Sequence, residues 1–150
     1  MAGTDVAGPA YSDLLGLARD AAQEAGALVR SRRAEGVEVA DTKSSPTDVV
    51  TEVDRAAEQL IRSRLLAARP DDGFLGEEGD SRETASGVTW VVDPIDGTVN
   101  FLYGIPQYSV SVAAVIAGDA VAGVVLDVVS GECFTAWKGG GAWCDGVPLA

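Results

Sequence analysis

The apolar residues of this chain change their spacing near residue 74, and this change limits the folds that the chain can adopt. Over residues 11–33 and about 47–68, apolar side chains recur at every third or fourth position, which predicts two amphipathic helices. Beyond residue 74, apolar residues form short runs separated by glycines, which is typical of strands. The expected strands cover residues 37–42, 74–76, 88–92, 109–116, 121–129 and 133–137, with tight turns at 118–119 and 145–146. Two helices followed by an antiparallel meander predict an α+β layered domain.

Composition excludes several classes of function. The 150 residues suit one domain, and the 47% hydrophobic share is enough for a core. The net charge of −12 argues against a nucleic-acid partner, because phosphate backbones are bound chiefly through lysine and arginine. The chain has no histidine, so it contains no Ser-His-Asp triad, no histidine-ligated zinc and no phosphohistidine. Chemistry carried out by carboxylates stays open.

The cysteines and the N-terminal residues indicate in which cellular compartment the protein is expected. Cys133 and Cys144 match no metal-binding spacing and are too few for a disulfide framework, although they can still meet across a hairpin. Residues 1–10 show neither a basic leader nor an apolar run. Residues 97–118 carry no charge, but their polar residues and proline are poor material for a membrane span. We therefore expect a reduced, cytoplasmic protein with no membrane partner.

One segment brings two carboxylates together with a turn. A hydrophobic strand runs into Asp93, and Asp96 follows three positions later. Gly97 permits a tight turn, and Thr98 offers a hydroxyl and an amide at a possible helix start, where anions bind. Neighbouring carboxylates repel each other unless a cation lies between them, and oxygen ligands alone favour Mg²⁺ or Mn²⁺. The competing interpretation is a structural turn in which one aspartate bonds a backbone amide.

Two further acidic elements favour a shared site over a simple turn. Glu77 and Glu78 follow another expected strand, and Asp54 lies one turn into the second expected helix, on its apolar side. Taken singly, Asp54 and Glu78 are better explained as surface side chains. Taken together, they predict a metal site beside an anion-binding turn, an arrangement suited to phosphate-ester hydrolysis.

Residues 93–101, followed by 104–106, resemble the first signature of the inositol monophosphatase family. Upstream segments 43–48, 50–54 and 76–78 agree with this family in order, so the resemblance covers about residues 10–150. It implies a Mg²⁺-dependent phosphomonoesterase that acts on inositol monophosphate. Related phosphatases acting on histidinol phosphate, fructose bisphosphate or phosphoadenosine phosphate share the aspartate core and remain alternatives.

The resemblance also implies a role for each ligand of two or three Mg²⁺ ions. Glu77 and Asp93, with the carbonyl of Ile95, would hold the first ion, and Asp93 and Asp96 would hold the second. Glu77 would help to hold a third ion near the loop at Lys43.

The remaining implied roles concern the substrate. The amides of Gly97 and Thr98 would bind the phosphate of a small phosphate ester. Asp54 would hydrogen-bond Thr98, and the Thr98 hydroxyl and Glu77 would orient a metal-activated water for in-line attack. Lithium sensitivity is also implied.

The chain departs from this family in one respect. Family members continue into a second α/β half with a Trp-Asp-x-Ala-Ala-Gly signature, and no segment here matches it. We therefore expect residues 1–150 to form the N-terminal part of an αβαβα sandwich, which is commonly a homodimer at full length. Alone, the chain should bind Mg²⁺ weakly and hydrolyse poorly. A non-catalytic interaction protein, docking through its helices or open sheet face, is the alternative from another class.

Overall fold

The computed structural model describes residues 8–35, 46–77, 79 and 81–149. Its elements follow one another in the order α1 (Tyr11–Glu35), α2 (Pro46–Ala68), β1 (Gly73–Leu75), β2 (Val88–Asp96), α3 (Thr98–Tyr103), β3 (Ser109–Ile116), β4 (Asp119–Asp127), β5 (Cys133–Trp137), β6 (Gly141–Cys144) and β7 (Val147–Pro148). Both long helices and the strand pattern are confirmed. The strand expected at 37–42 and the loop residue Lys43 lie outside the described residues.

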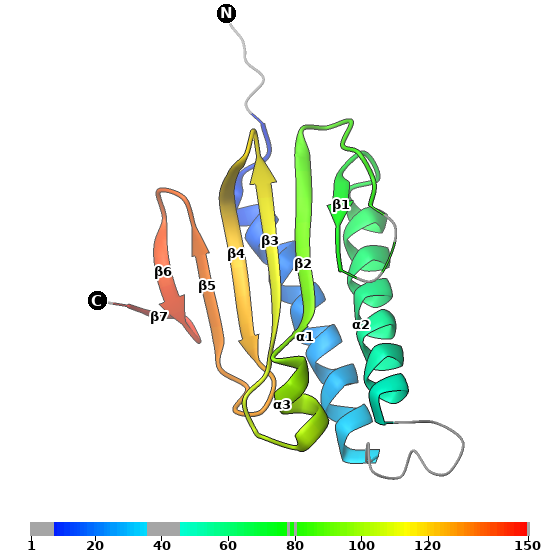
Figure 1. Ribbon diagram of the computed structural model, residues 1–150. Coiled ribbons are helices and arrows are strands. Elements are labelled where there is room, and N and C mark those ends of the chain that lie inside the picture. Colours follow the sequence, from blue (N-terminus) through cyan, green and yellow to red (C-terminus); the bar gives the residue numbers. More distant parts are fainter. Residues whose placement is uncertain (1–7, 36–45, 78, 80, 150) are drawn as a thin grey trace, which may run out of the picture.

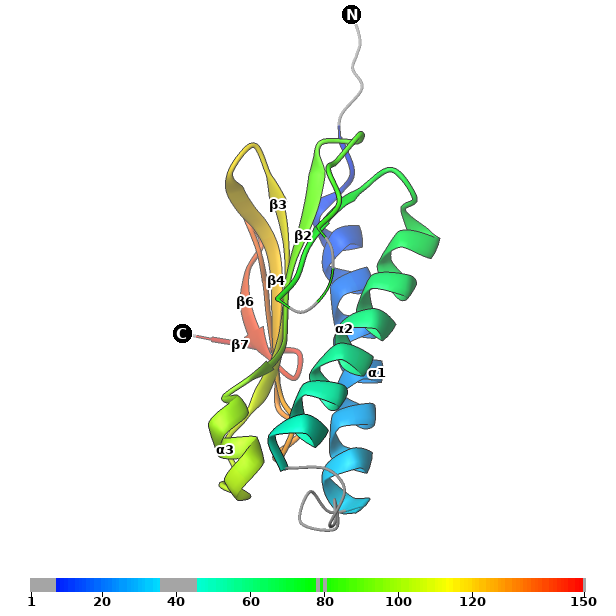
Figure 2. The same ribbon diagram turned by 45° about the vertical axis from the view of Figure 1, so that its right-hand side comes forward.

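The strands form one layer and the long helices form another. Within the described residues, seven strands make a single sheet in sequential order; β1 and β2 are parallel, and every later pair is antiparallel. Helices α1 and α2 lie side by side on one face of this sheet, and α3 lies at the end of β2 (Figure 1, Figure 2). The α+β class with two helices packed on a largely antiparallel sheet is therefore confirmed.

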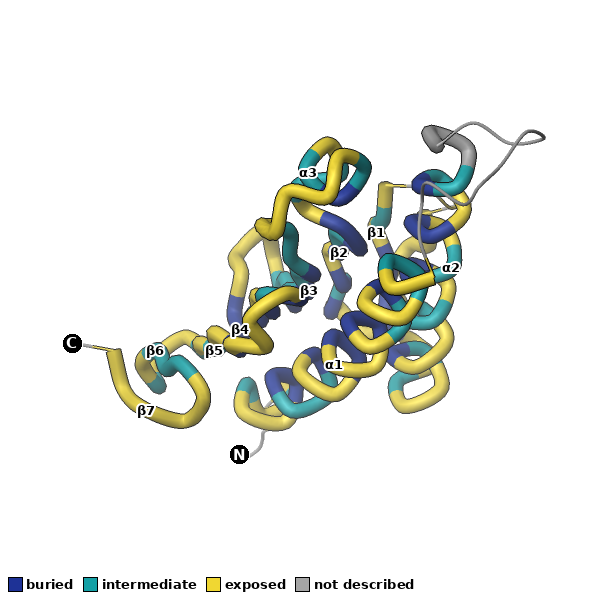
Figure 3. Tube along the Cα trace, turned by 90° about the horizontal axis from the view of Figure 1, so that it is seen from below, coloured by how far each residue is buried: buried dark blue, intermediate teal, exposed yellow. Residues whose placement is uncertain are grey.

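The core fills the space between these two layers. In Figure 3, the buried parts of α1 and α2 face the strands, and their outer surfaces are exposed. Helix α1 approaches β4 closely, because a Cβ added at Gly26 would overlap the buried side chain of Leu126. Small residues on α1 thus allow helix and sheet to pack without a gap. None of the helices in the described part of the chain is both long and apolar enough to cross a membrane.

A buried aspartate ties the start of β2 to the segment before β1. Asp72 is 1% exposed and accepts hydrogen bonds from Trp90 Nε1 at 2.8 Å and Ser86 Oγ at 2.6 Å. Arg69 Nε lies 2.5 Å from one of its carboxylate oxygens and balances its charge. The three donors satisfy a carboxylate that would otherwise be costly to bury.

The bounds of several strands differ from the sequence-based expectation; β4, for example, covers Asp119–Asp127 instead of 121–129. Strand β2 continues to Asp96 instead of ending at Asp93, because Asp96 still pairs with Ser109 of β3. The β3–β4 turn is centred on Ala117 and Gly118, one position before the expected turn. Both residues have positive φ, of 51° and 80°, which matches the twist of a two-residue hairpin.

Candidate active site

A bulge in β2 places Asp93 and Asp96 on the same face of the sheet. In a regular strand, residues three apart point to opposite faces. Here Asp93 pairs with Ser111 and Asp96 pairs with Ser109, so three positions on β2 match two positions on β3. The extra residue lies at Pro94–Ile95, both of which are buried. Both aspartates therefore point away from the helices, and Asp96 is exposed.

Glu77 reaches the same face from the neighbouring strand. Strands β1 and β2 are parallel, with Leu75 opposite Val91, so continuing this register places Glu77 beside Asp93. Partial burial raises the pKa of Asp93 to about 7, together with a hydrogen bond to the Glu77 carboxylate and the charges of Glu77 and Asp96. The structure thus places the three acidic side chains expected to share a site on one face of the sheet, with Glu77 and Asp93 in contact.

The donor set fits a hard divalent cation. Glu77, Asp93 and Asp96 supply only oxygen atoms, and the charges of Glu77 and Asp96, which a cation would balance, add to the effect of burial on the pKa of Asp93. Glu77 and Asp93 are in contact, whereas Asp96 acts on Asp93 through its charge. In the described ranges, no three acidic or thiol side chains are arranged closely enough to enclose an ion. Binding would therefore require the three carboxylates to draw together.

A glycine turn joins the end of β2 to α3. Gly97 has φ 94°, and a Cβ at this position would lie 3.0 Å from the carbonyl oxygen of Gln107. Both the backbone angle and the close approach therefore require glycine. Thr98 begins α3, and its hydroxyl donates to the carbonyl of Ile95 at 3.0 Å. The first amides of a helix have no acceptor within the helix, so those of Gly97 and Thr98 can face an anion.

Helix α2 contributes two nearly buried carboxylates. Asp54, expected from the sequence, is 8% exposed, and Glu58, one turn later, is 4% exposed. The Glu58 carboxylate accepts hydrogen bonds from the backbone N–H groups of Glu77 at 2.7 Å and Gly79 at 2.5 Å. Sequence reasoning missed Glu58, although its position was a usable signal: it lies on the apolar stripe of the helix, between buried Ala57 and Ile61.

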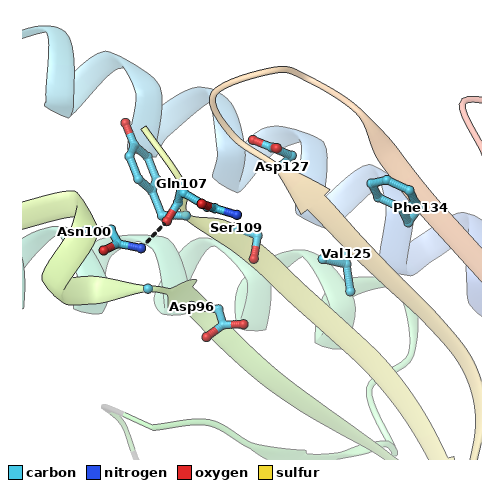
Figure 4. Close-up of a pocket in the computed structure, with 9 residues that line it drawn as sticks. Asp96, Asn100, Gln107, Ser109, Val125, Asp127 and Phe134 are labelled. Atoms are coloured by element: carbon cyan, nitrogen blue, oxygen red, sulfur yellow. Dashed lines mark hydrogen bonds between the residues drawn. The ribbon is translucent and has the colours of Figure 1, made fainter. Parts of the chain in front are cut away.

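A cavity of about 420 Å³ opens beside the glycine turn. Asp96 and Asn100 border it on one side, and Asp127 and Phe134 border it on the other (Figure 4). The Asn100 side-chain amide donates to the carbonyl of Gln107 at 2.8 Å, which ties α3 to the segment entering β3. The cavity is thus adjacent to the carboxylates and open to a small molecule.

The fold and site together define an α+β layered protein with carboxylates gathered at the ends of two parallel strands, beside a glycine turn. The chain belongs to the inositol monophosphatase family, whose model matches residues 10–150. An inositol-1-monophosphatase of Mycobacterium leprae is 50% identical over 140 residues, covering 84% of this chain and 48% of the relative. A histidinol-phosphatase of Chlorobaculum parvum is 44% identical over 100 residues, covering 67% of this chain and 39% of the relative.

Solved structures agree with this membership. The crystal structure of the extragenic suppressor protein suhB from Bartonella henselae superposes with a TM-score of 0.80 at 36% identity, covering 91% of this chain and 53% of that one. The chain thus spans about half the length of the inositol-1-monophosphatase and suhB relatives that it matches.

Proposed function

We propose that this chain carries the metal- and phosphate-binding part of a Mg²⁺-dependent phosphomonoesterase that acts on inositol monophosphate. The observation that supports it best is the placement of Glu77, Asp93 and Asp96 on one sheet face, with Glu77 and Asp93 in contact, next to Gly97 and Thr98. These carboxylates and the Ile95 carbonyl would hold two or three ions. The Ile95 oxygen has two lone pairs, so it can accept from Thr98 and still bind a cation.

The roles proposed for the side chains are those that the family resemblance implies. The amides of Gly97 and Thr98 would hold the phosphate and present phosphorus for in-line attack. The Thr98 hydroxyl and the Glu77 carboxylate would orient a water molecule, and Glu77 would accept its proton. Asp54 would align Thr98 from α2. The bound Mg²⁺ ions would lower the pKa of the attacking water and stabilise charge on the leaving alkoxide.

The family resemblance adds finer expectations to this proposal. They comprise inhibition by Li⁺ and a homodimer at full length, and the small number of cysteines adds a cytoplasmic location. The name of the Chlorobaculum parvum relative makes histidinol phosphate the strongest alternative substrate. Fructose bisphosphate and phosphoadenosine phosphate are the other esters to compare.

A chimera tests the proposal directly. The part of this chain that aligns with the Mycobacterium leprae relative would replace the corresponding segment of that relative. Phosphate release would be followed with inositol 1-phosphate, histidinol phosphate and fructose bisphosphate. We expect Mg²⁺-dependent release that is fastest with inositol 1-phosphate and is abolished by Asp93→Asn. Activity that survives Asp93→Asn would show that the metal assignment is wrong.

The isolated chain provides the complementary measurement. We expect it to bind Mg²⁺ weakly and to release little phosphate, because part of the metal site is expected to come from residues that it does not contain. Full turnover by the 150 residues would refute this division of the site. A chimera that folds but hydrolyses no ester would favour the non-catalytic interaction protein.

A further inference from the structure

Glu58 forms a direct link between helix α2 and the backbone that carries Glu77. Its carboxylate is 4% exposed, and its two oxygens accept separate N–H groups, Oε1 from Glu77 and Oε2 from Gly79. Hydrogen bonds from amides to a carboxylate are among the stronger ones in proteins. The segment after β1 is therefore held to α2 at the residue whose side chain meets Asp93.

The glycines around Glu77 fit this contact. A Cβ added at Gly76 would overlap the Glu58 carboxylate, and one added at Gly79 would lie 2.9 Å from Oε2. Gly76 does not have the positive φ that would itself require glycine. The absence of a side chain at these positions is thus explained by the space that Glu58 occupies.

The orientation of Glu77 follows from this geometry. Gly76 would direct a side chain toward the helices, where Glu58 lies, and Glu77 directs its own toward the opposite face, beside Asp93. Because Oε1 of Glu58 binds the amide of Glu77 itself, a shift of Glu58 moves the backbone from which the Glu77 carboxylate projects.

We propose that Glu58 is a positioning residue for the candidate metal site, holding Glu77 against Asp93 through the amides of Glu77 and Gly79. It acts from the helix side through the backbone of Glu77, and it is not itself one of the proposed ligands of the ion. The inference rests on the proposed function, because the consequence of misplacing Glu77 is weaker binding of a divalent cation. Partners that orient metal ligands typically contribute about 10–100-fold to metal affinity.

The test measures the binding of Mn²⁺ to the 150-residue chain by calorimetry, at a temperature where every variant is folded. Glu58→Gln keeps the shape of the side chain, but it replaces one acceptor by an N–H donor that faces an amide. Gly79→Ala approaches the same contact from the other side. Glu52→Gln is the matched control, because it removes the same charge from α2 at a side chain that is 74% exposed.

We expect Glu58→Gln and Gly79→Ala each to weaken Mn²⁺ binding at least tenfold, and Glu52→Gln to leave it unchanged. In the double variant, the second substitution should add little, because both disturb one contact. Hydrogen exchange in the metal-free chain should become faster at the amides of Glu77 and Gly79 in Glu58→Gln.

Two results would overturn the inference. Unchanged exchange at both amides would show that Glu58 does not hold this backbone. Mn²⁺ affinity within twofold of the parent would show that it holds the backbone for stability alone. A parent chain that binds no Mn²⁺, together with an inactive chimera, would instead refute the proposed function and with it the metal role of Glu58.

Discussion

Asp93 and Asp96 lie three residues apart on β2 and yet point to the same face, because their partners on β3, Ser111 and Ser109, are two residues apart. The bulge between them converts an alternating strand into a pair of carboxylates beside Glu77. The negative charge gathered there has consequences for stability that can be measured without substrate.

The metal-free chain should lose stability as the pH rises from about 4 to about 7. The pKa of Asp93 in the folded chain is raised from 3.8 to about 7, so folding favours the protonated carboxyl group. The resulting contribution to stability is complete below pH 3.8 and is lost as the pH rises through 7. Asp93→Asn removes this loss, and we expect it to stabilise the metal-free chain at pH 8 by about 1 kcal/mol, allowing for solvent screening of a partly exposed group.

Urea unfolding in EDTA at pH 5 and pH 8 measures this effect. Asp20→Asn, at an exposed position of α1, is the control for removing one negative charge. Mg²⁺ should stabilise the parent at pH 8 and should have a much smaller effect on Asp93→Asn. Equal stabilisation by Mg²⁺ in both chains would place the ion elsewhere.

Thr98 should affect hydrolysis more than it affects folding. Its hydroxyl donates to the Ile95 carbonyl at 3.0 Å, at the oxygen proposed as a ligand of the first ion. In the chimera, we expect Thr98→Ala to lower kcat about 100-fold or more and Thr98→Ser to keep most of it. Mg²⁺ affinity, measured by calorimetry, should change little in either variant. A loss of Mg²⁺ affinity equal to the loss of kcat would show that Thr98 acts only through the metal site.

Gly97→Ala should be more costly than the same change at another glycine with positive φ. Left-handed backbone costs a residue with a Cβ about 1–2 kcal/mol. At Gly97, where φ is 94°, an added Cβ would lie only 3.0 Å from the Gln107 oxygen, whereas at Gly118, where φ is 80°, it would meet open space. Urea unfolding of both variants separates the cost of the left-handed backbone from the cost of the close approach to Gln107. Equal losses of unfolding free energy in the two variants would show that the Gln107 segment moves aside freely.

Asp72→Ala should strongly destabilise the chain without changing the site. It removes the acceptor of the Trp90 indole and of the Ser86 hydroxyl in a position that is 1% exposed. We expect a loss of about 3 kcal/mol or more in the free energy of unfolding. Asp71→Ala, at the exposed neighbouring residue, is the control. Similar losses in both variants would mean that the hydrogen bonds of Asp72 contribute little.

Much of this protein is determined by short stretches of sequence. The spacing of apolar residues was enough to predict α1, α2 and the meander, because it reflects the periods of the helix and the strand. Asp93, Asp96, Gly97 and Thr98 were recognisable together because they are close neighbours in the chain. Glu77 could be added because it follows another short strand.

Only the tertiary structure decided how these residues meet. The common face of Asp93 and Asp96 depends on pairing with β3, whose register is set by residues of both strands and by the burial of one face. The contact of Glu58 with the Glu77 amide joins residues 19 positions apart, and that of Asp72 with Trp90 joins residues 18 apart. Local periodicity is a property of neighbouring residues, whereas these contacts exist only after helices and strands have packed together.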